Sequence, residues 1–198
     1  MDKFWLWLGA AGCLLWPAQG AWALSGGDFA RSEVRFLVRA MKIPIDGRFK
    51  RVSGRLELDF EHLAASRVEV QIDLASLDIG LPGTEAELKK GEWFAVERFP
   101  VASFVASDIR RVGPRQYRAV GEFTLKGVTR TLALPFERVH EPGGEALDGS
   151  ISIRRLDFGI GAAEWADLRL IGNQVQVHFK LPLTSPDVSR AAGRQPRG

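Results

Sequence analysis

The chain alternates between apolar and polar residues over most of its length, with a period of two. Toward the C-terminus, Val175, Val177, Phe179 and Leu181 are apolar and the residues between them are polar. Because successive side chains of a β-strand point to opposite faces of the sheet, this period indicates strands with one buried and one wet face. Eight runs show the pattern, at positions 34–40, 55–60, 67–74, 102–106, 117–125, 132–136, 147–153 and 174–181.

Short turn signals separate these runs. Lys126-Gly127 falls between two of them and predicts a tight hairpin, and Gly113-Pro114 marks another turn. No regular alternation of strands with helices is present, which argues against a parallel α/β fold. We therefore predict an all-β protein built from antiparallel sheet.

One short helix is predicted near residues 84–91. Thr84 and Glu87 have the spacing of a capping box, in which each side chain bonds to a backbone N–H at the start of the helix. Trp93 and Phe94 follow directly. A short helix that carries two large aromatic side chains is suited to close one end of a barrel, or simply to fill its core.

Eight antiparallel strands leave two exposed edges unless the sheet closes, so we predict an eight-stranded barrel. A barrel of this size has an interior that side chains fill or that one small ligand occupies. Here small and aromatic residues are interleaved at the inward positions. This mixture is compatible with a slender apolar ligand, and equally with an ordinary taper in which small residues pack against large ones. The positions are Ala40, Ala102, Ala106, Ala119, Gly121 and Gly149, with Phe36, Phe104, Phe123 and Phe179.

The two ends of the chain differ from the body. Residues 1–23 carry one lysine, then an uncharged apolar run, then Ala21-Trp22-Ala23, which is the order of a cleaved secretory signal peptide. The run is too short for a membrane span. We expect the folded domain to occupy residues 24–185 and an arginine-containing, disordered tail to occupy residues 186–198. With such a leader, we expect the protein to be exported to the periplasm.

Charge and residue chemistry exclude several kinds of binding partner and site. The chain has 27 Lys and Arg against 24 Asp and Glu, with no basic stripe, so no nucleic-acid partner is expected. The single Cys lies inside the leader, which excludes a disulfide framework. His62, His140 and His178 are far apart and form no paired ligand motif, so no metal site and no cofactor are expected.

Catalysis is not expected either. No Gly-x-Ser-x-Gly elbow is present, although a triad could assemble from distant positions. Asp157, Glu164 and Asp167 are close in sequence and could act as an acid–base pair, as in a hydrolase acting on lipid. Carboxylates of this kind more often cap turns or pair with neighbouring arginines. We predict that the protein is not an enzyme and has no catalytic residues.

The order of several short motifs resembles the YceI-like family of periplasmic proteins. Each motif is weak alone, but together they cover about residues 28–184. In chain order they are Ser-Glu-Val-Arg-Phe at 32–36, Asp-Gly-Arg-Phe at 46–49, Ser-Leu-Asp-Ile at 76–79, Glu-Trp-Phe at 92–94, Arg-Phe-Pro-Val-Ala-Ser-Phe at 98–104, Gly-Glu-Phe-Thr-Leu-Lys-Gly-Val-Thr-Arg at 121–130, the run 153–161 and Asn-Gln-Val at 173–175.

The resemblance implies a lipocalin-like barrel that holds a polyisoprenoid or an isoprenoid-quinone-like amphiphile in an apolar tunnel. Many family members carry a His where this chain has Arg39-Ala40-Met41, which removes one head-group contact. The stretch 163–168 is more similar to members encoded with, or fused to, b-type cytochromes of the quinone pool. We expect nine residues to bind the ligand: Phe36, Phe104, Phe123 and Phe179 as tunnel walls, Trp93, Phe94 and Trp165 near a closure, and Val38 and Tyr117 as further contacts.

The predicted function is therefore that of a periplasmic binding or carrier protein. The alternative is an accessory subunit that docks on a membrane b-type cytochrome and holds no internal ligand.

Overall fold

The computed structural model describes residues 26–184, so the expected signal peptide at 1–23 and tail at 186–198 lie outside the described residues. The elements are strands joined by short turns, with one α-helix, α1 (Pro82–Leu88). The strands are β1 (Gly26–Gly27), β2 (Glu33–Ala40), β3 (Ile43–Phe49), β4 (Val52–Glu57), β5 (Arg67–Asp73), β6 (Leu77–Asp78), β7 (Val101–Arg111), β8 (Gln116–Leu125), β9 (Val128–Glu141), β10 (Gly144–Arg154) and β11 (Ile171–Thr184). Four 3₁₀ turns complete the described part: η1 (Phe29–Arg31), η2 (Leu63–Ala65), η3 (Leu74–Ser76) and η4 (Arg155–Phe158).

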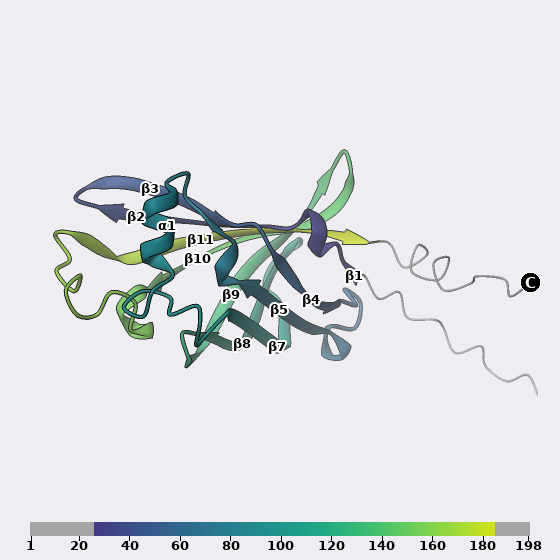
Figure 1. Ribbon diagram of the computed structural model, residues 1–198. Helices are drawn as coiled ribbons and strands as arrows, with labels where there is room; N and C mark the ends of the chain where they lie inside the picture. The colour runs from purple at the N-terminus through teal and green to yellow at the C-terminus, as the bar shows by residue number, and fades with distance from the viewer. Residues whose placement is uncertain (1–25, 185–198) are drawn as a thin grey trace, which may run out of the picture.

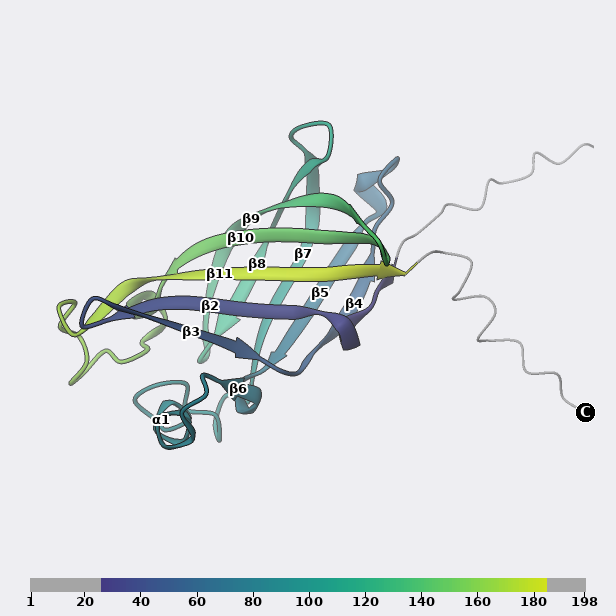
Figure 2. The same ribbon diagram turned by 90° about the horizontal axis from the view of Figure 1, so that it is seen from above.

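The strands form one antiparallel sheet in the order β4-β5-β7-β8-β9-β10-β11-β2-β3-β6, with β1 beside β11. Figure 1 shows the sheet curling around its own axis, and Figure 2 shows β9, β10, β11, β2 and β3 side by side in front of β4, β5, β7 and β8. The curled sheet is a half-barrel, since its terminal strands β4 and β6 do not pair with each other. The all-β, antiparallel, lipocalin-like prediction is confirmed.

All eight expected strands are present, and β3 is the main addition to the predicted strand count. Its sequence begins Ile-Pro-Ile-Asp-Gly, which breaks the alternation, and Ile43 and Pro44 are exposed. Proline is tolerated in a strand at the edge of a sheet, where its missing N–H costs no ladder bond. Beyond β2, β3 pairs only through Arg48 and Phe49 with the two-residue β6.

The corner between β3 and β4 is held by η3 rather than by strand pairing. The backbone N–H of Lys50 donates to the carbonyl of Ser76 at 3.1 Å, and the N–H of Arg51 donates to Oγ of Ser76 at 3.0 Å. The N–H of Asp73 donates in turn to the carbonyl of Arg51 at 3.0 Å. The seam of the half-barrel is therefore fastened at this corner by hydrogen bonds and not by a strand ladder.

The helix begins earlier than its capping-box pattern predicts. Its N-cap is Leu81, with no side-chain cap, and Pro82 occupies the first turn. Proline is favoured there because its fixed φ suits a helix and the missing N–H has no partner in any case. The carboxylate of Glu85 accepts the backbone N–H of Ile79 at 2.9 Å, which fastens the preceding loop to the helix. The predicted Thr84–Glu87 cap is wrong for this reason.

Two packed clusters bracket the interior. One draws on side chains of β4, β7, β8, β9, β10 and β11 and includes Leu58, Phe60, Tyr117 and Phe136. The other, around Leu74, Trp93 and Phe158, lies beneath the segment that follows α1. The space between these clusters is the interior of the half-barrel.

Candidate functional site: an apolar two-chamber tunnel

The interior contains two adjoining chambers. The outer chamber has a volume of about 370 Å³, and its lining includes Phe36 and Val38 of β2 and Leu81, the N-cap of α1. The inner chamber, of about 120 Å³, lies deeper and is lined by Phe104, Phe179 and other apolar side chains. An apolar cavity of about 150 Å³ already accepts benzene, so the outer chamber is large enough for a substantial apolar molecule.

The chambers share a wall. Four residues line both of them, and these residues come from β5, β8, β10 and β11: Ile72, Phe123, Ile153 and Val177. We call this ring the waist. Because the outer and inner chambers meet at the waist, together they form one tunnel along the barrel.

Strand geometry explains the apolar lining. On β11, Val175 lines the outer chamber, Val177 the waist, and Phe179 and Leu181 the inner chamber. A strand advances about 3.4 Å per residue, so this wall alone spans roughly 20 Å. The tunnel is therefore long and narrow rather than round.

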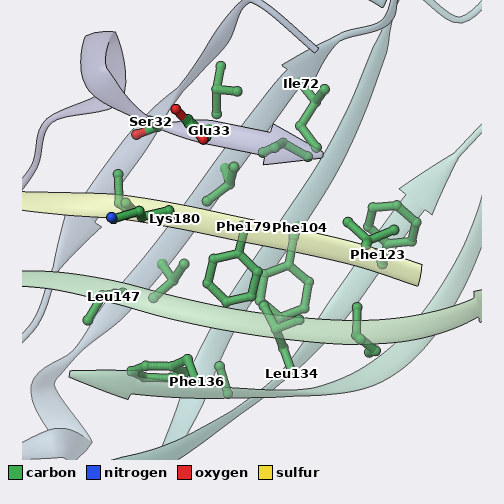
Figure 3. Close-up of a pocket in the computed structure, with 18 of the residues that line it drawn as sticks. Ser32, Glu33, Ile72, Phe104, Phe123, Leu134, Phe136, Leu147, Phe179 and Lys180 are labelled. Atoms are coloured by element: carbon green, nitrogen blue, oxygen red, sulfur yellow. The ribbon is translucent and has the colours of Figure 1, made fainter. Parts of the chain in front are cut away.

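Aromatic rings from four strands surround the inner chamber. Figure 3 shows Phe179 and Phe104 close together, with Phe136 and Leu147 to one side and Phe123 toward the waist. Beyond them lies the packed cluster that includes Leu58 and Phe60. The inner chamber is consequently bounded by solid core at that side.

The structure brings most of the expected site residues together. Seven of the nine line the tunnel: Phe36, Val38, Trp93 and Phe94 in the outer chamber, Phe104 and Phe179 in the inner chamber, and Phe123 at the waist.

Tyr117 and Trp165 lie outside both linings. Tyr117 is 2% exposed and stacks on Phe136 with ring centroids 5.4 Å apart, so it belongs to the packed cluster behind the inner chamber. Trp165 is 37% exposed and packs against Trp93 at 5.8 Å, on the solvent side of the outer chamber. Neither ring lines a chamber: Tyr117 lies in the packed cluster instead of the tunnel, and Trp165 lies beside Trp93, near the closure at which it was expected.

Several lining residues were not anticipated. Leu81 and Leu88, seven residues apart along α1, both face the outer chamber, and Ile45 of β3 faces them. The seven-residue spacing is a helical signal that was present in the sequence. Ile45 belongs to the strand that the alternation did not reveal, so nothing local indicated it.

The small residues of the barrel wall do both things expected of them: some pack against large rings, and some leave space for a ligand. A Cβ on Gly47 would lie 2.4 Å from Cζ of Phe36, and one on Gly149 would lie 2.5 Å from Cζ of Phe179, so these rings occupy the space beside glycines of the neighbouring strand. Ala40 lines the outer chamber and leaves space open. Tapered packing and open cavity therefore coexist in the same wall.

A buried arginine organises the rim of the outer chamber. Arg155 is 3% exposed, and its guanidinium donates five hydrogen bonds to backbone carbonyls. The acceptors are Gly172 at 3.1 Å, Ile160 and Gly161 at 2.8 Å, Trp165 at 2.6 Å and Ile171 at 2.9 Å. Burial lowers the pKa of Arg155 from its usual value. The side chain fastens the segment between β10 and β11 across one side of the chamber.

Lys126 fastens the neighbouring side. It lies in the predicted hairpin between β8 and β9, and its ammonium donates to the carbonyls of Glu92 and Gly159, each at 2.8 Å. Burial lowers the pKa of Lys126, while the nearby Glu92 carboxylate opposes that shift. The segments after α1 and after η4 are thus joined through one side chain.

The outer chamber opens to solvent beside α1, since Leu81 lines it and is also 54% exposed. We call this opening the mouth. Exposed apolar side chains gather around it: Met41, Ile43, Leu81, Trp165, Leu168 and Leu170. The N–H of Met41 donates to the carbonyl of Leu170 at 2.6 Å, which joins the β2–β3 turn to the segment before β11. We call these six residues the apolar collar.

Residues 26–184 also bear on metal, membrane and acid–base sites. No group of three or more His, Cys, Asp or Glu there is arranged to hold a metal ion. No helix in that range is both long and apolar enough to cross a membrane. Asp157 and Asp167, considered above for acid–base chemistry, accept hydrogen bonds from Arg154 and Arg169 at 2.9 and 2.7 Å.

The comparison with known protein families identifies the family of this chain. The model of the YceI-like domain matches residues 27–183. The chain belongs to the YceI-like family. A UPF0312 protein of Vibrio vulnificus is 30% identical over 135 residues, covering 64% of this chain and 71% of its own length. A UPF0312 protein of Photorhabdus laumondii is 32% identical over 122 residues, covering 59% and 63%.

Solved structures agree with this fold. BcnA of Burkholderia cenocepacia superposes with a TM-score of 0.75 at 30% identity, covering 80% of this chain and 99% of its own. A polyisoprenoid binding domain from Saccharophagus degradans superposes with a TM-score of 0.63 at 16% identity, covering 82% and 98%. The YceI protein of Campylobacter jejuni gives 0.61 at 17% identity, covering 71% and 84%. The last two similarities concern the fold alone.

Proposed function

We propose that this YceI-like protein is a periplasmic carrier that holds a polyisoprenoid or an isoprenoid quinone in its tunnel and performs no chemistry on it. The observation that carries the proposal is the shape and lining of the tunnel, which is long, narrow and apolar from the mouth to the inner chamber. The polyisoprenoid binding domain with the same fold supports the choice of ligand class.

The energetics favour a long hydrocarbon chain. Each buried CH₂ contributes about 0.8 kcal/mol, so a chain of several isoprene units binds tightly without hydrogen bonds. The tunnel offers such a chain about 20 Å of apolar wall, comparable to the hydrocarbon depth of one bilayer leaflet, roughly 15 Å. The hydrocarbon chain of a ligand that enters this tunnel therefore leaves the membrane for an equally apolar environment.

The decisive experiment is to purify the protein from the periplasm without detergent, denature it and analyse the organic extract by mass spectrometry. A prenyl lipid or quinone in stoichiometric amount is expected. An empty extract, repeated after incubation of the protein with membrane lipids, would contradict the proposal.

Phe123 provides a test at a single position. It lines both chambers, and its ring meets Phe158 edge-on with centroids 5.4 Å apart. Phe123→Asp introduces a charge at the waist and is expected to abolish uptake of a fluorescent prenyl probe while circular dichroism remains β-like. Glu122→Asp, on the opposite face of β8, is the control and should bind normally. Unchanged uptake by Phe123→Asp would remove this residue from the site.

A second candidate function is docking on a membrane b-type cytochrome as an accessory subunit without an internal ligand. The apolar collar favours it, because an apolar patch around a protruding end is a common feature of interaction surfaces. Co-purification with an integral membrane partner, together with an empty tunnel, would support docking over carriage.

A further inference from the structure

We propose that the apolar collar docks the protein on the surface of a lipid bilayer, with the mouth of the tunnel against the lipid. The proposal goes beyond the carrier function, because it concerns how the outside of the protein meets a membrane and not what the tunnel holds. It rests on where the exposed apolar side chains lie and on the charges between them.

Apolar exposure is concentrated in the collar. Within residues 26–184, ten large apolar side chains are exposed, and six of them form the collar. The other four are distributed over β2, β7 and the turn after β7: Leu37, Val101, Val105 and Val112. Scattered exposed apolar side chains are normal on a protein surface, whereas a gathered patch marks an interaction site. The collar is therefore the part of this surface that calls for a partner.

The collar projects from the molecule. Figures 1 and 2 both show the β2–β3 turn and the segment before β11 side by side, reaching beyond α1 at one end of the barrel. The turn contributes Met41 and Ile43, and the segment contributes Leu168, each of them more than half exposed. Apolar side chains that enter a bilayer surface reach about 5–10 Å, to the boundary between head groups and acyl chains. A projecting edge reaches this depth while the barrel stays outside the bilayer.

Cations alternate with the apolar side chains of the collar. Met41-Lys42-Ile43 and Leu168-Arg169-Leu170 share one pattern, in which a cation is flanked by two apolar residues. Long basic side chains at such positions lay their hydrocarbon stems along apolar surface and keep the charge among the head groups. This alternation suits the boundary of a bilayer better than a uniformly apolar interface.

The charge of the collar favours an anionic surface at the β2–β3 turn. The segments 39–43, 81–90 and 162–170, which supply the collar, together carry five cations and four acids. Asp167 is paired with Arg169, and Glu87 with Lys90. The surplus lies on the turn, because segment 39–43 has two cations and no acid.

The place of the collar favours lipid over a protein partner. Leu81 belongs to the collar and also lines the outer chamber, so the patch continues into the tunnel. A lipid surface against the collar joins hydrocarbon directly to this lining, whereas a protein seated there would cover the mouth. Trp165 at the rim fits the same partner, because tryptophan is enriched at the level of the head groups.

The test is co-sedimentation of the protein, purified from the periplasm without detergent, with protein-free vesicles. One set of vesicles consists of phosphatidylethanolamine with the anionic phosphatidylglycerol, and the other of phosphatidylcholine alone. We expect the protein to bind both sets, and to bind the anionic set more tightly at low salt. Absence of binding to both would overturn the proposal. Binding that appears only when an integral membrane protein is incorporated would overturn it in favour of a protein partner.

A pair of double variants locates the surface. Met41→Gln with Leu168→Gln removes two apolar side chains of the collar at constant charge and is expected to lower vesicle affinity at least about tenfold. Val105→Gln with Val112→Gln, at positions of similar exposure on β7 and just after it, is the matched control and should bind normally. All variants carry the same N-terminus, so a difference between them reports on the collar. Equal affinities of the two double variants would refute docking through the collar.

A charge variant tests the orientation. Lys42→Gln removes one cation of the turn and should weaken binding to the anionic vesicles about fivefold at low salt, with no change on phosphatidylcholine. Arg118→Gln, at an exposed position of β8, removes the same charge away from the collar and is the control. Equal losses in the two variants would contradict an orientation in which the turn meets the lipid.

Docking and carriage are measured separately. Met41 and Leu168 line neither chamber, so uptake of a prenyl probe from solution reports on the tunnel and not on the collar. A protein that takes up the probe and ignores vesicles would refute docking alone. A protein that binds vesicles through the collar and takes up no probe would refute carriage alone.

Discussion

At the scale of single residues, Arg155 and Lys126 hold the segments beside the outer chamber, because backbone carbonyls accept hydrogen bonds from their charged groups. Arg155 satisfies five carbonyls of an irregular segment that would otherwise lack partners in a buried position. The sequence suggested Arg154, Arg155 and Arg169 alike as partners for nearby carboxylates. Arg154 binds Asp157 at 2.9 Å, whereas Arg155 turns inward. β10 ends at Arg154, and the position of that strand end determines that Arg155 turns inward. The residue types alone do not show where the strand ends.

Replacing Arg155 with lysine is expected to lower the free energy of unfolding by about 3 kcal/mol, although the charge is kept. A single ammonium has three donors and cannot reach carbonyls arranged around a planar fork, so buried acceptors lose their partners. Urea denaturation measures the change. Arg154→Lys, on the exposed neighbour, is the matched control and should cost little.

Asp78 gives a prediction about pH. Hydrogen bonds from Lys50 and Arg48, and from the N–H of Gly80, lower the pKa of Asp78 from 3.8 to about 2. Because the folded-state pKa lies below the ordinary value, the ionised carboxylate stabilises the fold above about pH 4, and this contribution disappears as the pH falls through about 2.

Asp78→Asn should therefore lower the urea midpoint at pH 7, and the difference from the natural protein should shrink as the pH approaches 2. A difference that stays constant between pH 7 and pH 2 would show that Asp78 acts through something other than its charge.

At the scale of elements, two hairpin turns adopt nearly the same backbone conformation with different residues. Met41 and Lys42 have φ of 48° and 69°, and Lys126 and Gly127 have φ of 50° and 75°. Positive φ at both central residues is the type I′ turn, which matches the twist of the strands and favours glycine at the second position. The Lys126-Gly127 hairpin was predicted from its glycine, whereas the Met41-Lys42 turn carries no such signal.

The non-glycine residue in the Met41-Lys42 turn is expected to lower the stability of the fold measurably. Lys42→Gly removes the side-chain strain of positive φ and is expected to stabilise the protein by about 1 kcal/mol. Gly127→Ala should destabilise it by a similar or larger amount, since the new Cβ would lie 2.7 Å from the ring of Phe99. Thermal unfolding of the two variants should shift in opposite directions.

The elements also show how far sequence reasoning reached. Alternation identified the eight strands and five of the tunnel-lining residues, because period two follows directly from strand geometry. Trp93 and Phe94 were expected from their place directly after the predicted helix. It missed β3, whose Pro44 and exposed Ile43 break the pattern, and it placed Tyr117 in the tunnel. Tyr117 does face inward, but neighbouring rings fill the space around it, and alternation reports the face of a strand without reporting whether that face meets a cavity or packed core.

At the scale of the whole molecule, the waist divides the tunnel into a wide and a narrow part. Ile72→Trp adds a large ring where the chambers meet and is expected to block the inner chamber. A short prenyl alcohol that occupies only the outer chamber should retain its affinity, and a long one should lose at least about tenfold. Fluorescence titration with a chain-length series checks this, with Val105→Trp on the outer face as the control. Equal losses for short and long chains would mean that the two chambers act as one undivided space.

The order of strands in the sheet also governs how the chain reaches its native state. From β4 through β11, each long strand pairs with a long strand close to it in sequence, so this part assembles from local hairpins. The pairing of β2 with β11 joins positions 33–40 to positions 171–184 and is the long-range step. Contacts of such large sequence separation slow folding, because loop-closure entropy is lost before they form. The β2–β3 hairpin, made first during synthesis, therefore waits for the last strand, and the tunnel wall that it supplies exists only once the whole domain has been made.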